Sequence, residues 1–161
     1  PGQPPRTTTV AGIDAAGLAP GEAAAPASVA LRLSDDLDIA RGDLIVAAGS
    51  GPSPSTGLAA DVCWLSARPL RPAARVLVKH GTATVRALVE SVDGALDLDT
   101  LALAPAAELA LNDIGRVVLR LAAPLPLEPY AEHRRTGAYL VIDPQDGQTL
   151  AAGMPRDGGT P

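Results

Sequence analysis

Short runs in which hydrophobic and polar residues alternate dominate the pattern of this chain. In residues 28–33, Val29, Leu31 and Leu33 alternate with small or polar residues. A period of two places the apolar side chains on one face of a β-strand. The same period recurs more strongly in residues 58–65, and it predicts a half-buried strand whose apolar face consists of Leu58, Ala60, Val62 and Trp64.

Further runs of this kind recur along the chain, with turn residues between them. We predict strands at residues 8–13, 28–33, 44–47, 58–65, 75–79, 82–92, 114–121, 138–142 and 149–154. Asp93-Gly94 is typical of a hairpin turn, and residues 143–147 are expected to turn between the last two strands. Residues 97–107 are ambiguous, because their composition suits a short helix that Pro105 would limit. Short strands separated by turns indicate an all-β barrel or sandwich.

The composition decides what the core can contain and which partners are disfavoured. The chain has no Phe, so its core must consist of aliphatic residues, with Trp64 expected as an anchor and Tyr139 expected to pack. The net charge of −5 and the single lysine, Lys79, argue against nucleic-acid binding, which needs clustered positive charge. No apolar run is long enough for a membrane helix. The lone Cys63 permits no internal disulfide, which favours a cytoplasmic location.

The residues that could carry chemistry do not form a recognisable site. No stretch matches the phosphate-binding pattern G-x-x-x-x-G-K-[ST]. The acidic run of residues 35–38 lacks the Gly and Glu of a calcium loop, and Arg41-Gly42-Asp43 is interpreted as a tight turn. Cys63 is expected to be a packed hydrophobe, and His80 and His133 are expected at the surface. We therefore assign no catalytic, cofactor-binding or metal-binding residue.

Four segments, in order, carry a resemblance to a known family. They are SVALRLSDDLDIARGDLIV (28–46), ADVCWLSARPLRPAARVLVKHGTATVRALV (60–89), LALNDIGRVVLRL (109–121) and PYAEHRRTGAYLVIDPQDGQTLAAGM (129–154). Together they resemble the last two domains of the large, GTP-hydrolysing subunit of bacterial sulfate adenylyltransferase, a relative of elongation factor Tu. Residues 91–103 follow the family's pattern more loosely.

This resemblance implies a domain organisation. Residues 1–48 would be the end of a truncated barrel like domain 2 of elongation factor Tu, and residues 49–57 would be a linker. Residues 58–154 would form a six-stranded Greek-key barrel like domain 3, followed by a tail at residues 155–161. Because the chain begins at Pro1 without methionine, we interpret it as a fragment of a longer protein.

The resemblance also implies a function for the parent protein. The parent would convert ATP and sulfate to adenylylsulfate and diphosphate, coupled to GTP hydrolysis, in sulfate assimilation. GTP and Mg²⁺ would bind to an N-terminal domain that this chain does not contain, and no cofactor is expected in the chain itself. The expected partners are the small catalytic subunit, the chain's own GTPase domain and, in many relatives, a fused adenylylsulfate kinase domain.

Two alternatives remain open at this point. The chain could be part of a translation-factor barrel pair that binds tRNA or a protein, although its negative charge disfavours tRNA. It could also be a stand-alone interaction module. In each of these interpretations the chain itself carries no catalytic motif.

Overall fold

The computed structural model describes residues 5–15 and 21–156. Every regular element in these residues is a β-strand, so the all-β prediction is confirmed. The chain divides into two compact units, with the boundary between Ala40 and Arg41. In the described part of the chain, no helix is long and apolar enough to cross a membrane.

The smaller unit contains one antiparallel pair of strands, β1 (Val10–Asp14) and β2 (Ala30–Leu33). Arg32 of β2 forms an exposed ion pair with Asp14 of β1, at 3.0 Å between Nε and Oδ2. In β2 the apolar Leu31 and Leu33 are half-buried and Arg32 is exposed, as the alternation predicts. None of the described residues of this unit belongs to the buried core.

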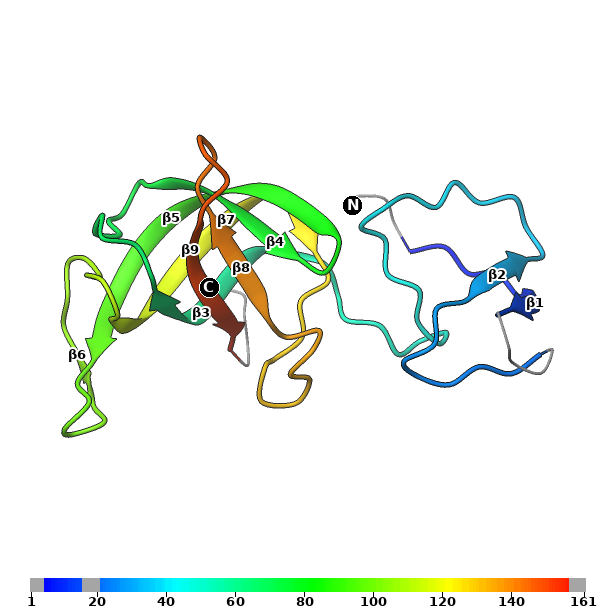
Figure 1. Cartoon of the computed structure of the whole chain (residues 1–161), viewed down its shortest axis with the longest axis horizontal. Helices are drawn as coiled ribbons and strands as arrows, with labels where there is room; N and C mark the ends of the chain where they lie inside the picture. Colours follow the sequence, from blue (N-terminus) through cyan, green and yellow to red (C-terminus); the bar gives the residue numbers. More distant parts are fainter. Residues whose placement is uncertain (1–4, 16–20, 157–161) are drawn as a thin grey trace. The chain divides into compact units, whose positions relative to one another are not determined.

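The larger unit contains a closed barrel (Figure 1). Hydrogen-bonded neighbours follow the order β4-β8-β9-β3-β7-β5, and β5 pairs again with β4, so that six antiparallel strands complete a ring. A short β6 pairs with the end of β5. The strands are β3 (Ser55–Trp64), β4 (Arg75–His80), β5 (Ala83–Leu96), β6 (Leu103–Ala104), β7 (Ile114–Leu125), β8 (Tyr139–Ile142) and β9 (Thr149–Pro155). The predicted six-stranded barrel is therefore confirmed.

Side chains that alternate along the strands fill the barrel. Every second residue of β3 from Leu58 to Trp64 is at most 3% exposed, which confirms the predicted apolar face. Val85 and Val89 of β5 are buried in the same way, while Arg86 between them is exposed. Aliphatic residues make up most of the core, and Trp64 and Tyr139 are its buried aromatic members in the described residues.

Residues 44–47 do not form the predicted strand. Leu44, Ile45 and Val46 are exposed, and no described strand pairs with them. A strand depends on the hydrogen bonds and side-chain contacts that a neighbouring strand provides, so apolar composition alone does not create one. Similarly, residues 49–57, expected as a linker, overlap β3, which begins at Ser55.

The hairpin predicted at Asp93-Gly94 is wrong. Both residues lie within β5, at an irregularity in its pairing with β7 between Val92 and Gly94. A β-bulge of this kind bends a strand and does not end it. The chain turns only after Leu96, so the ambiguous residues 97–107 form a loop and β6, and no helix.

Candidate functional site

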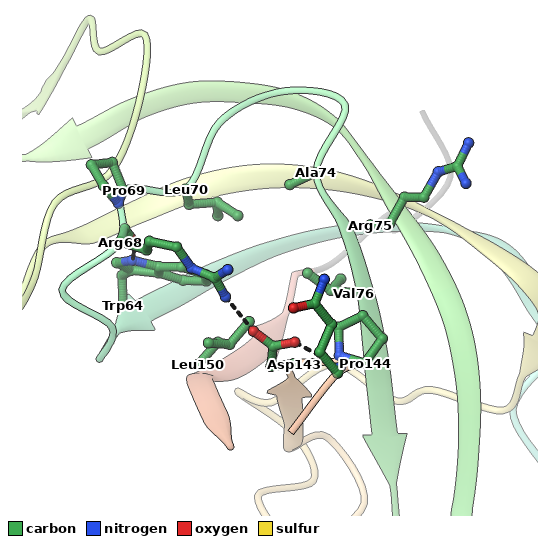
Figure 2. A pocket seen from close by; sticks show the side chains of 11 residues that line it. Trp64, Arg68, Pro69, Leu70, Ala74, Arg75, Val76, Asp143, Pro144 and Leu150 are labelled. Carbon is green, nitrogen blue, oxygen red and sulfur yellow. Dashed lines mark hydrogen bonds and ion pairs between the residues drawn. The ribbon is translucent and has the colours of Figure 1, made fainter. Parts of the chain in front are cut away.

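A concave site of the barrel lies at the end of β3 (Figure 2). It is a pocket of about 280 Å³, bounded by the loop after β3, the start of β4 and the turn after β8. Trp64, Leu70, Val76 and Leu150 contribute apolar surface, and Arg68, Asp143 and Gln145 contribute polar atoms. A pocket with few convergent polar groups is the natural place to look for ligand binding.

Trp64 connects this pocket to the core. Its side chain is 3% exposed, and its indole Nε1–H donates a hydrogen bond to the carbonyl oxygen of Arg68 at 2.7 Å. The ring therefore fixes the loop that carries Arg68, and its only polar hydrogen is already used. This confirms that Trp64 is a packing residue.

Asp143 is the buried charged residue of the pocket. The guanidinium of Arg68 pairs with Oδ2, and Oδ1 accepts a hydrogen bond from the backbone N–H of Gln145 at 2.8 Å. The hydrogen bond from Gln145 is the main reason that the pKa of Asp143 is lowered; Arg68 also lowers it, and burial opposes the shift. The carboxylate is thus ionised, and both of its oxygens already have partners. This arrangement suits the fixing of a turn better than proton transfer.

The turn after β8 is held by backbone hydrogen bonds as well. The N–H of Gly147 donates to the carbonyl of Asp143 at 3.0 Å, and the N–H of Asp143 donates to the carbonyl of Gln148 at 2.8 Å. Gly147 has a φ of 76°, a conformation that glycine adopts without steric strain. The turn predicted at residues 143–147 is confirmed, and Asp143 organises it.

A second polar cluster lies on the outer side of the barrel around Asp61 of β3. Arg156 donates to both carboxylate oxygens, at 3.0 and 3.3 Å, and the Nε of Arg116 in β7 lies 3.4 Å from Oδ1. All three side chains are about one third exposed. These contacts link β3 to β7 and to the residue after β9, so the cluster holds strands together.

The prediction that His80 lies at the surface is wrong. His80 is 8% exposed, and its Nε2 lies 2.5 Å from the carbonyl oxygen of Thr136, in the loop before β8. This loop covers the end of β4, which local sequence does not reveal. His133 is exposed as predicted, with its Nε2 3.6 Å from the carboxylate of Glu128.

Cys63 is less buried than the prediction of a packed hydrophobe implies. It is only half-buried and lies on the side of β3 opposite Trp64, where its cross-strand partners are Ile114 and Ala152. Both partners are apolar, so neither can act as a base toward the thiol.

Tyr139 packs inside the barrel, as predicted, with its ring against Gly153 of β9. Its hydroxyl is buried and has no hydrogen-bond partner among the described residues. Burial, and secondarily the charge of Asp61, raise the pKa of Tyr139 well above its usual range. The hydroxyl therefore stays protonated at neutral pH and acts as a packing group.

The remaining candidates do not form a metal site. Within residues 5–15 and 21–156, no three His, Cys, Asp or Glu side chains are close enough to hold an ion. Asp35, from the acidic run, accepts a hydrogen bond from the Thr8 hydroxyl at 2.6 Å and lies exposed. Gly42 has a φ of 108°, which agrees with the predicted turn at residues 41–43.

Comparison of the sequence with known proteins places the chain in a family. Residues 57–155 match the model of the GTP-eEF1A C-terminal domain-like family, and the chain belongs to that family. Among curated proteins, it is 40% identical over 151 residues to the bifunctional enzyme CysN/CysC of Mycobacterium tuberculosis, covering 92% of this chain. It is 37% identical over 129 residues to sulfate adenylyltransferase subunit 1 of Alteromonas mediterranea, covering 80% of this chain.

These relatives are much longer than the chain. The match covers 25% of the Mycobacterium protein and 27% of the Alteromonas protein, so the chain spans about a quarter of their length.

Among solved structures, Sup35 complexed with GDP has a TM-score of 0.81 at 17% identity, covering 93% of this chain and 37% of Sup35. At that identity the likeness shows the fold alone. The resemblance to the sulfate adenylyltransferase large subunit and to the barrels of translational GTPases is confirmed.

Proposed function

We propose that the chain is a non-catalytic scaffold within the GTP-hydrolysing subunit of a sulfate adenylyltransferase. The observation that carries this proposal is the match to sulfate adenylyltransferase subunit 1 and CysN/CysC proteins. In three of these relatives the identity is 37–42% over 80–92% of this chain.

The proposed parent reaction joins ATP and sulfate to give adenylylsulfate and diphosphate, driven by GTP hydrolysis. GTP and Mg²⁺ would bind to a GTPase domain outside this chain, and ATP and sulfate would bind to a small catalytic subunit. A relative named as a bifunctional enzyme fits a parent that also carries a kinase domain. In this arrangement the barrel positions other domains and subunits.

The use of the polar side chains supports a scaffold. Asp143 and Arg68 fix the turn after β8, and Asp61 links three segments of the barrel wall through Arg116 and Arg156. Groups that already hold turns and strands in place are poor candidates for turnover chemistry, which needs groups free to react. A barrel closed by hydrogen bonds offers a rigid outer surface instead.

The test is direct binding. The purified 161-residue chain is titrated by calorimetry with the small catalytic subunit and, separately, with the GTPase domain, both taken from the same organism. We expect saturable binding of at least one partner, with a Kd on the order of micromolar or tighter. A tRNA titration serves as the control and should show no saturable binding. Failure of both proteins to bind would overturn the scaffold proposal.

A further inference from the structure

The loop between β5 and β6 displays leucines to solvent. Leu101 is 73% exposed and Leu98 is 69% exposed, the highest values among the large hydrophobic residues that the structure describes. Leu103, in β6, is 39% exposed. We call residues 97–104 the leucine hairpin; Figure 1 shows it projecting from the barrel beside the label β6. Exposed leucines grouped on one ordered element are typical of an interaction surface.

The leucine hairpin is held in one conformation. The Oδ1 atom of Asp97 accepts hydrogen bonds from the backbone N–H groups of Asp99, at 3.0 Å, and Thr100, at 2.8 Å. The N–H of Leu101 donates to the carbonyl of Asp97 at 2.8 Å, and the N–H of Asp97 donates to the carbonyl of Ala102 at 2.9 Å. A displayed side chain on a pre-ordered loop loses less conformational entropy on binding.

Leu101 sits in an unfavourable backbone conformation within this loop. Its φ of 56° lies in the left-handed region, which leucine rarely adopts. Such strain persists only where surrounding contacts impose it, and here the bonds to Asp97 do so. The consequence is that a leucine side chain stands at the tip of the loop, where a glycine or asparagine would be less strained.

The negative charge around the leucine hairpin indicates the kind of surface that the hairpin would bind. Residues 87–115 contain six Asp or Glu residues and no Lys or Arg. Glu90 and Glu108 pair with Arg120 and Arg71, but the acidic groups of the leucine hairpin itself form no ion pair in the described structure. The complementary surface therefore combines an apolar depression with Arg or Lys at its rim. A second copy of this chain is disfavoured, because each copy carries a net charge of −5.

We infer that the leucine hairpin docks into an apolar depression with a basic rim on the small catalytic subunit. This inference rests on the proposed function and adds to it the surface through which the two proteins would meet. Leu98 and Leu101 would enter the depression, and Asp99 would face the basic rim.

The test compares the unaltered chain with the double variant Leu98→Gln/Leu101→Asn in calorimetric titrations against the small subunit. Both replacements are polar and of moderate size, and asparagine tolerates the φ of residue 101. Leu140→Gln is the matched control: Leu140 is 38% exposed on β8, which β4 separates from β5. We expect at least a tenfold loss of affinity in the double variant, no change in the control, and unchanged melting temperatures in both.

A second variant tests the electrostatic part. Asp99→Asn should weaken binding at low ionic strength and reduce the salt dependence of the Kd. Equal affinity of the double variant and the unaltered chain would overturn the docking inference while the scaffold proposal stands. The inference also fails if the unaltered chain binds only the GTPase domain. It fails equally if sedimentation shows a dimer of this chain that the double variant dissociates.

Discussion

Trp64 joins a packing role to a structural hydrogen bond. Its indole is buried in the barrel and donates to the carbonyl of Arg68. We expect Trp64→Ala to lower the free energy of unfolding by about 3–5 kcal/mol, because it leaves a large cavity and frees the Arg68 loop. Urea unfolding followed by circular dichroism measures this loss. Leu65→Ala is the control, because the neighbouring Leu65 is 47% exposed and should change stability by less than about 0.5 kcal/mol. Similar losses in the two variants would contradict the core role.

Asp143 makes stability depend on pH. The folded state lowers the pKa of Asp143 below the ordinary 3.8, chiefly through the hydrogen bond from the Gln145 N–H. The stabilising contribution of the ionised carboxylate is therefore complete above pH 3.8. The contribution is then lost as the pH falls from about 3.8 through the lower folded pKa. Asp143→Asn should flatten this part of the acid-induced loss of stability, as measured by urea unfolding over a series of pH values.

The Arg68→Met variant refines the test of Asp143. It should keep part of the pH dependence, because the stronger hydrogen bond from Gln145 remains. A pH profile of Asp143→Asn identical to that of the unaltered chain would show that other carboxylates account for the acid sensitivity.

At the residue scale, burial that follows from local alternation can be predicted from the sequence, whereas burial that follows from distant contacts cannot. The burial of Trp64 follows from alternation within one strand, which is local information. The burial of His80 depends on Thr136, 56 residues later in the chain. The pairing of Arg68 with Asp143 likewise joins residues 75 positions apart. Contacts of this kind leave no periodic signal, so the pocket could not be predicted from the sequence.

At the scale of elements, the strands with strong alternation were predictable and the irregular ones were not. The strands of the barrel were predicted at their approximate positions, except for the two-residue β6. Gly94 explains one error: a Cβ there would lie 2.5 Å from the carbonyl oxygen of Ala104, so glycine is required for the approach of β6. The same Asp-Gly pair that suits a hairpin turn also suits a bulge, and only the pairing of β5 with β7 separates them.

At the scale of the whole molecule, the two units differ in how they are stabilised. The barrel closes six strands around an aliphatic core, whereas β1 and β2 form an isolated pair. A two-stranded sheet is marginally stable in water, because it buries little apolar surface. The family resemblance predicted the barrel correctly. It could not predict that residues 44–47 would stay unpaired, because a strand of that composition needs a neighbour that the described residues do not provide.

This difference predicts the order of proteolysis. Trypsin cleaves after Arg and Lys, and Arg32 in β2 and Arg41 just after the unit boundary both lie outside the barrel strands. Cleavage there needs only local opening, whereas cleavage at Arg86 in β5 or Arg116 in β7 requires the closed barrel to unfold. Limited digestion followed by mass spectrometry should therefore yield a product beginning at Leu33 or Gly42 before any cleavage within the barrel strands appears. That product should still melt cooperatively. Equally rapid cleavage at Arg86 and at Arg32 would mean that the barrel depends on the smaller unit for its stability.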